Sequence, residues 1–371
     1  MLDPFPIPAP PALANFIRPF ADFFHFTVLP LHIHELIFAF LFYTCVNLYF
    51  APWISSRLFP RVYAGFNKRT RLNWNVHVVS FVQSSLINTF ALWVMWVDKE
   101  RAAMTWSEKI WGYTGASGMI QSFAGGYFLW DLCITSMNVH IFGWGMLAHA
   151  VSALFVFSLG YRPFLNFYGS TFILYELSSP FLNVHWFCDK LNLTGSTVQL
   201  YNGMALLFTF FCSRLVWGSY QSVRVFYDIY RALTSEMRDV PIDWAAKPSL
   251  NPDSDIMRFA GNRAMPMWLA VTYLGANIIL NGLNWVWFGR MIETVRKRFD
   301  PPLGTKGTKK AAKEEVLVEG VDVETDTDGG AEGVPIHVSG KEDINLARGI
   351  DAVGRRSVEI EKREVRSRRK A

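Results

Sequence analysis

Seven long apolar segments limit what this chain can fold into. Most of them approach or exceed the roughly 20 residues that carry an α-helix across a bilayer. The segments are Leu36–Ile54, Val76–Val97, Met119–Met137, Trp144–Leu159, Phe164–Phe187, Val198–Tyr220 and Met267–Ile292. They predict an all-α fold, a polytopic membrane helical bundle of about seven transmembrane helices.

The composition supports a membrane protein and places most of the charge after the last span. Of the 371 residues 51% are hydrophobic and only 18% are charged, against about 25% charged in an average soluble chain. Asp300–Ala371 alone holds 14 of the 36 Lys and Arg and 15 of the 31 Asp and Glu. We therefore expect a disordered C-terminal tail. The net charge of +5 is modest and no basic helix with base-stacking aromatics is present, so nucleic-acid binding is not expected.

Basic residues near the span ends predict the orientation. They gather in the first loop and directly after the last span, and with seven spans these two regions share one side, which the positive-inside rule makes cytosolic. The segment 1–35 is then lumenal, 36–292 is the membrane domain, and the tail 293–371 is cytosolic. The predicted lumenal loop Gln221–Pro266 carries dispersed basic residues that weakly oppose this orientation.

Ionisable residues inside the spans point to a polar interior. Glu176 lies near the middle of the apolar stretch Phe164–Lys190, and a carboxylate at a helix centre costs roughly 2.5–3.5 kcal/mol on insertion scales. At helical spacing, Glu176 shares a stripe with Ser179 and Asn183. Two other spans contribute Asp131 and Arg214. The pattern favours a shared polar cavity over two alternatives, charge pairing for stability and hydrogen bonds between helices.

Four segments together carry a family resemblance. They are RLNWNVHVVSFVQS (71–84), GGYFLWDL (125–132), MLAHAVSAL (146–154) and YELSSPFLNVHWFCDK (175–190). In order and spacing they resemble the TLC-domain family, and they are more similar to the fungal and animal branch of TLC domain-containing protein 4 than to the ceramide synthases. The resemblance implies a multi-pass protein of the endoplasmic reticulum or a related endomembrane that acts in lipid or sphingolipid homeostasis.

The ceramide synthases of the same family suggest a reaction that this chain could catalyse. Those enzymes join a fatty acyl-CoA to a sphingoid base with two adjacent histidines and acidic residues in the following span. Here His149 matches one histidine but is flanked by Ala148 and Ala150, while Glu176 and Ser179 stand near the two acidic positions. If the chain is an enzyme, the resemblance implies His149 and Glu176 as catalytic residues. The broken histidine pair argues against that activity.

The expected function is thus to hold a lipid or acyl chain in a polar-lined intramembrane cavity. Its expected lining is Asp131, His149, Glu176, Ser179, Asn183 and Arg214. The alternatives are a ceramide-synthase-like N-acyltransferase and a proton- or ion-coupled lipid transporter. The expected partners are membrane lipids, with acyl-CoA or a sphingoid base as candidates, and no cofactor is expected. The segment HIHEL (32–36) lacks the spacing of a zincin site, so no metal site is expected there.

Overall fold

The computed structural model describes residues 1–234, 256–259, 265–299, 317–318 and 321–322. Two compact units divide the chain, and the first comprises Met1–Val295 and Leu317–Asp322. Of the second unit the described residues are 296–299, which end the last helix. The cavity and the side-chain clusters discussed below lie in the first unit.

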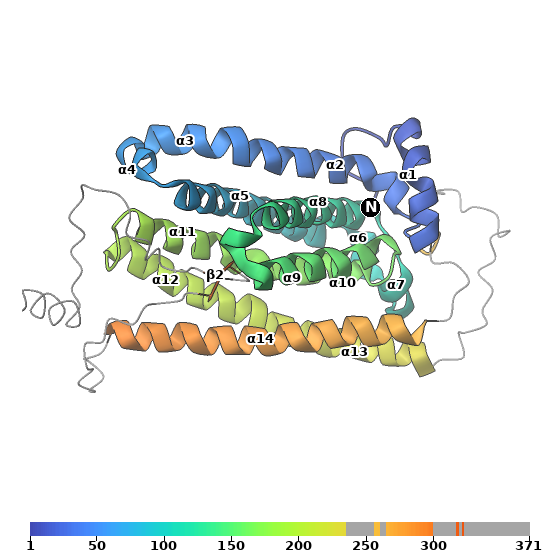
Figure 1. Cartoon of the computed structure of the whole chain (residues 1–371). Coiled ribbons are helices and arrows are strands. Elements are labelled where there is room, and N and C mark those ends of the chain that lie inside the picture. The colour runs from blue at the N-terminus through green and yellow to red at the C-terminus, as the bar shows by residue number, and fades with distance from the viewer. Residues whose placement is uncertain (235–255, 260–264, 300–316, 319–320, 323–371) are drawn as a thin grey trace, which may run out of the picture. The chain divides into compact units, whose positions relative to one another are not determined.

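Helices make up nearly all of the described chain (Figure 1). The first group is α1 (Pro11–Phe24), α2 (Leu29–Cys45), the π-helix η1 (Val46–Phe50), α3 (Ala51–Leu58), α4 (Pro60–Gly65), α5 (Lys68–Val97), α6 (Lys99–Ala103), α7 (Trp106–Trp111) and α8 (Gly115–Met137). The second group is α9 (Val139–Ser158), the 3-10 helix η2 (Leu159–Tyr161), α10 (Asn166–Phe172), the 3-10 helix η3 (Ile173–Ser178), α11 (Ser179–Lys190), α12 (Thr197–Phe210), the π-helix η4 (Phe211–Trp217), α13 (Gly218–Thr234) and α14 (Met267–Phe299). Two short antiparallel strands follow, β1 (Leu317–Val318) and β2 (Val321–Asp322).

Five helical stretches in the described chain are long and apolar enough to cross a membrane. They are Leu29–Leu58, Lys68–Val97, Val139–Tyr161, Thr197–Thr234 and Met267–Val295. These stretches contain most or all of the first, second, fourth, sixth and seventh predicted spans. The predicted class, an all-helical multi-pass membrane protein, is confirmed, whereas the count of seven spans is not established.

The third predicted span is a helix of a different character. α8 has 23 residues, of which 15 are buried, so most of its surface faces protein. Small residues allow that burial: a Cβ on Gly126 would lie 2.6 Å from the carbonyl oxygen of Leu36 in α2. Because glycines let two helix backbones approach closely, α8 packs directly against α2.

The prediction of one continuous helix over Phe164–Phe187 is wrong. The segment forms α10, η3 and α11 in series. Pro180 lies in the first turn of α11, where its missing N–H would have no intrahelical partner in any case. Residues in a 3-10 helix turn by about 120° instead of 100°, so the predicted stripe through Glu176 does not extend unchanged across η3.

Two predicted boundaries also differ from the structure. The loop expected over Gln221–Pro266 begins as helix, because α13 continues from η4 to Thr234. α14 continues past Ile292 to Phe299. Residues 235–255 and 260–264 of the predicted loop lie outside the described residues, as does the predicted tail after 299 apart from β1 and β2.

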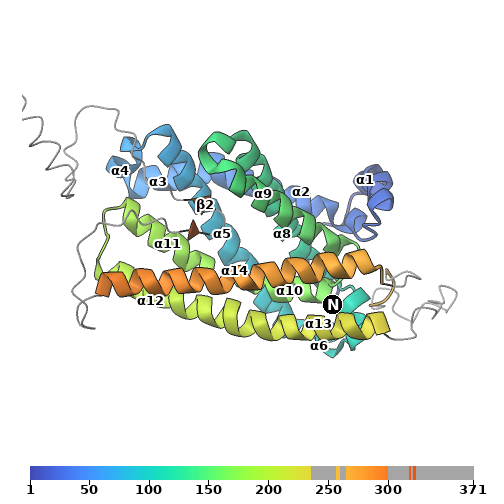
Figure 2. The ribbon, with the colours of Figure 1, turned by 60° about the horizontal axis from the view of Figure 1, so that its bottom comes forward.

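Specific contacts hold the helices of the bundle against one another. α14 runs beside the α12–η4–α13 helix in both views (Figures 1 and 2). The Asn281 side-chain amide donates to Ser222 Oγ at 2.8 Å, and the Phe210 and Phe288 rings stack with centroids 6.1 Å apart. On the other side, α2, α5 and α8 share a buried apolar core that includes Tyr43, Ile87 and Ile120.

Candidate functional site

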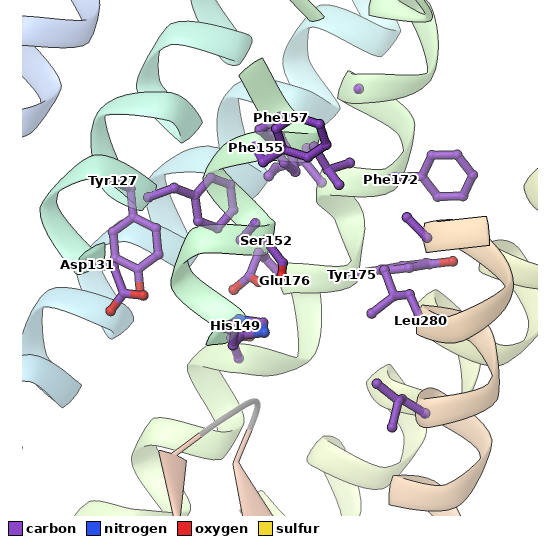
Figure 3. A pocket seen from close by; sticks show the side chains of 18 of the residues that line it. Tyr127, Asp131, His149, Ser152, Phe155, Phe157, Phe172, Tyr175, Glu176 and Leu280 are labelled. Carbon is purple, nitrogen blue, oxygen red and sulfur yellow. The ribbon is translucent and has the colours of Figure 1, made fainter. Parts of the chain in front are cut away.

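A cavity of about 730 Å³ lies among α5, α8, α9, α10, η3, α11 and α14. Its volume falls in the range of roughly 300–1,000 Å³ that is typical of small-molecule sites. Most of its walls are apolar, with Phe155 and Phe157 from α9, Phe172 from α10 and Leu280 from α14 (Figure 3). Such a cavity suits a ligand that is largely hydrocarbon.

Four ionisable side chains of the cavity come from three elements. Tyr127 and Asp131 lie one turn apart on α8, His149 belongs to α9, and Glu176 belongs to η3. Figure 3 shows the side chains of His149 and Glu176 among the residues that line the cavity, although they come from different helices. No Lys or Arg is among the described residues that line this cavity. Its ionisable groups are therefore carboxyls, phenols and imidazoles.

Five of the six side chains predicted for a lipid cavity line this one. They are Asp131, His149, Glu176, Ser179 and Asn183. Asp131, Ser179 and Asn183 are buried, whereas His149 and Glu176 are half-buried. The structure brings these residues together, and their roles remain predictions.

Arg214, the sixth residue, is buried in η4 and is not among the cavity-lining residues. Its Nε donates to the Tyr175 carbonyl at 3.0 Å and to Ser178 Oγ at 3.3 Å. Its Nη1 donates to Asn284 Oδ1 at 3.3 Å. Arg214 thereby ties η3 to α14, and two of its acceptors flank Glu176 in sequence. It is placed to position the backbone that carries Glu176.

The sequence prediction omitted part of the polar wall on α5. His77 and Ser80 line the cavity beside Asn183. Asn183 Oδ1 lies 2.7 Å from His77 Nδ1, and Asn183 Nδ2 donates to Ser80 Oγ at 3.0 Å. Because an amide oxygen only accepts, His77 Nδ1 carries the proton. The available signal was the spacing of His77 and Ser80, which puts both on one helix face.

The hydroxyl nearest to His149 in sequence is not arranged as a nucleophile. Ser152 lies three residues after His149 on α9, but its Oγ donates to the Ala148 carbonyl at 2.8 Å. An activated serine would instead donate to a general base. The remaining chemistry open to His149 is proton transfer or hydrogen bonding to a bound molecule.

Comparison with known proteins identifies the family of this chain. The TLC domain model matches residues 73–293, a range that contains every cavity-lining residue from Val76 to Leu283. The fold and its cavity define a multi-pass helical membrane protein with an internal site. The chain belongs to the TLC domain family.

Individual relatives place the chain within that family. A TLC domain-containing protein of Schizosaccharomyces pombe is 36% identical over 310 residues, which cover 84% of this chain and 92% of that protein. Topoisomerase I damage affected protein 4 of Saccharomyces cerevisiae is 28% identical, covering 73% of this chain and 86% of that protein. Human TLC domain-containing protein 4 is 27% identical, covering 44% and 61%. The predicted resemblance to the TLC domain-containing protein 4 branch is confirmed.

Proposed function

We propose that this protein acts in membrane lipid homeostasis by holding one lipid molecule in the cavity. The acyl chain would lie against the apolar walls, and the polar end would lie against Asp131, His149 and Glu176. The observation that carries the proposal is an apolar cavity of about 730 Å³ with ionisable groups from five elements, α5, α8, α9, η3 and α14. We propose the endoplasmic reticulum or a related endomembrane as its location, on the family resemblance alone.

A buried hydroxyl supports a ligand with a polar group. Ser179 is 3% exposed and lines the cavity, and in the part of the chain that the structure describes its Oγ has no hydrogen-bond partner. Buried polar atoms are nearly always hydrogen-bonded in folded proteins. A hydroxyl, amide or amine at the polar end of a lipid would satisfy Ser179 Oγ.

The second candidate function is a ceramide-synthase-like N-acyltransferase. It is favoured by the presence of His149 and Glu176 in one cavity. One imidazole can remove a proton from an attacking amine while the carboxylate orients it. The second histidine of the synthases has no counterpart, since Ala148 lines the cavity and Ala150 is buried. We therefore rank this function below lipid holding, and coupled transport below both.

Photocrosslinking in lipid nanodiscs tests lipid holding. The probe is a phospholipid with a diazirine near the end of one acyl chain, and crosslinked peptides are identified by mass spectrometry. We expect labelling in residues 142–157 and a loss of at least fivefold in Ala276→Phe, because Ala276 lines the cavity. Ile278→Phe is the matched control, since Ile278 lies on the same helix, is 59% exposed and does not line the cavity. Equal labelling of all three proteins would exclude the proposal.

A separate assay distinguishes the enzyme. Purified protein is incubated with a labelled sphingoid base and acyl-CoAs of medium to very long chain. We expect no acylated product. Product that forms with the wild type and disappears in His149→Ala would replace lipid holding by acyl transfer as the function. In cells, lipidomics of a deletion strain carrying the wild type or His149→Ala names the lipid class.

A further inference from the structure

Three metal-ligating side chains that do not line the cavity meet at the start of α2. His32 and Glu35 lie in the first two turns of α2, and Asp3 lies in the segment before α1. One donor atom from each lies within 4.8 Å of the other two. His32 Nδ1 is 2.8 Å from Glu35 Oε1 and 3.6 Å from Asp3 Oδ2. The α2 stretch is one of the membrane-spanning candidates, so the cluster lies near one end of a span.

The inner part of this cluster is sealed, while its outer part reaches solvent. The side chains of His32 and Glu35 are 1% and 0% exposed, whereas that of Asp3 is 30% exposed. Within the described ranges, the buried Glu35 Oε2 has no hydrogen-bond partner. A buried carboxylate oxygen of this kind needs a proton or a cation to compensate it. Asp3 provides the route by which an ion reaches the cluster.

The imidazole of His32 is held in the orientation that a metal ligand needs. Its second nitrogen, Nε2, lies 2.5 Å from the Tyr113 hydroxyl. α8 packs against the same ring, because a Cβ on Gly118 would lie 2.2 Å from Nε2. Metal-bound histidines commonly donate their other ring N–H to an oxygen, which fixes the tautomer. In the metal-bound form Nε2–H would donate to the Tyr113 hydroxyl and Nδ1 would offer its lone pair to the ion. The ion would then replace the hydrogen bond between Nδ1 and Glu35 Oε1.

We propose that Asp3, His32 and Glu35 bind a divalent transition-metal ion such as Zn²⁺. Two carboxylates offset the charge of the ion, and one nitrogen with two oxygens is a donor set that zinc accepts. Donors about 2.0–2.2 Å from a tetrahedral ion lie roughly 3.4 Å apart. The 3.6 Å between His32 Nδ1 and Asp3 Oδ2 is close to this spacing, whereas the 2.8 Å between His32 Nδ1 and Glu35 Oε1 has to widen when the ion binds. Water completes the coordination on the exposed side. His34 is not among the clustered donor atoms, and its Nε2 donates to the Ile7 carbonyl at 2.7 Å.

The site joins parts of the chain that spacing in the sequence cannot relate. HIHEL supplies only two ligands, and the fold adds Asp3 from the N-terminal segment and Tyr113 from the residues before α8. The sequence expectation of no metal site rested on HIHEL alone. A bound ion would fasten the N-terminal segment to α2, which makes its role structural.

Zinc binding to the purified full chain tests the proposal. Tag-free protein in detergent is dialysed against Zn²⁺ buffered at a low free concentration, and bound zinc is measured by inductively coupled plasma mass spectrometry. We expect about one Zn²⁺ per chain and at least tenfold weaker binding in Asp3→Asn. Asp22→Asn is the matched control, because Asp22 is an exposed carboxylate on α1. Equal zinc content in the wild type and Asp3→Asn would overturn the site.

A second variant keeps the test independent of folding. Tyr113→Phe leaves all three ligands in place and removes the oxygen that orients His32, so Zn²⁺ affinity should fall about 10–100-fold. Tyr49→Phe, at a tyrosine that is 70% exposed, should leave it unchanged. Thermal unfolding in EDTA and in Zn²⁺ provides the second measurement. The proposal requires a zinc-dependent rise in Tm for the wild type that Asp3→Asn lacks, and the absence of that rise contradicts it.

Discussion

At the scale of single residues, Arg214 differs most between prediction and structure among the predicted site residues. The sequence placed its charge in the cavity, whereas the structure buries the guanidinium against three acceptors on η3 and α14. The Phe210 ring lies 5.0 Å from the guanidinium carbon. A planar group with several N–H donors suits that task, and the ammonium of lysine does not. Arg214 is therefore expected to act on stability first.

Replacing Arg214 should weaken the fold. Arg214→Leu leaves the Tyr175 carbonyl and Asn284 Oδ1 without this donor, and hydrogen bonds to charged groups contribute about 1.5–3 kcal/mol each. We expect a lower Tm in detergent and lower abundance in cells. Arg214→Lys should recover only part of the loss, because its single ammonium cannot reach η3 and α14 with the same geometry. Full recovery by lysine would show that charge alone matters.

Glu176 should behave in the opposite way. Because Glu176 lines the cavity, we expect Glu176→Leu to retain near wild-type abundance and to lose lipid crosslinking at least fivefold. The double variant Glu176→Leu with Arg214→Leu separates cavity function from ion pairing. We expect it to remain as unstable as Arg214→Leu. Recovery of both abundance and crosslinking in the double variant would mean that the carboxylate serves only as a partner of Arg214.

At the scale of elements, α8 serves as the fixed wall of the site. One face of α8 lies against α2 through Gly126, and the other presents Tyr127 and Asp131 to the cavity. α9 differs, because few of its residues are buried and its Gly143 has a φ of +81° at a kink. The cavity is therefore bounded by a tightly packed helix on one side and a loosely packed one on the other.

A pair of glycine substitutions tests this contrast. Gly126→Ala places a Cβ 2.6 Å from the Leu36 carbonyl oxygen, and such overpacking costs typically about 1–3 kcal/mol. Gly145→Ala on α9 meets open space, so the higher helix propensity of alanine should make it neutral or stabilising by up to about 1 kcal/mol. Thermal unfolding of the two variants under the same conditions measures the difference. Similar Tm values would show that α2 and α8 can separate without loss.

At the scale of the whole molecule, the predicted orientation is the same for five or for seven crossings, because both numbers are odd. Five stretches meet the length and apolarity of a span, and α8 and the α10–η3–α11 segment would complete seven. Seven crossings place the turn between α11 and α12 on the cytosolic side with the tail. That turn contains the sequon Asn192-Leu193-Thr194.

We therefore expect Asn192 to face the cytosol and to carry no glycan. The measurement is labelling of an Asn192→Cys variant by a membrane-impermeant maleimide in sealed endoplasmic reticulum microsomes, with the unaltered chain as the background control. Labelling before detergent is added indicates cytosolic exposure. Labelling only after detergent, or an endoglycosidase-sensitive mass shift of the wild type that Asn192→Gln abolishes, would reverse the orientation.

The sequence predicted what depends on composition and missed what depends on packing. Apolar length alone located the five membrane-spanning candidates, because the bilayer imposes one requirement on each of them. The division of Phe164–Phe187 into α10, η3 and α11 has no signal in the apolar pattern, and the contact between Arg214 and the Tyr175 carbonyl of η3 joins segments that are distant in the sequence. Helical spacing placed Ser179 and Asn183 together correctly within α11. Contacts between distant segments, such as His77 with Asn183 or Asp3 with His32, leave no periodic signal.

The loose packing of α9 determines the unit in which lipid occupancy of the cavity is measured. α9 lines the cavity through Phe155 and Phe157, whereas Trp144 and Val151 on the same helix do not line it and are strongly exposed. If α9 faces the bilayer, a lipid enters the cavity from the surrounding leaflet. Its occupancy then depends on the mole fraction of that lipid in the membrane and not on an aqueous concentration. Diluting the sample with buffer then leaves occupancy unchanged, whereas diluting the membrane with an inert lipid empties the cavity. Because all lipids of the leaflet compete for the cavity, even a small difference in affinity between two lipid species determines which of them the protein carries.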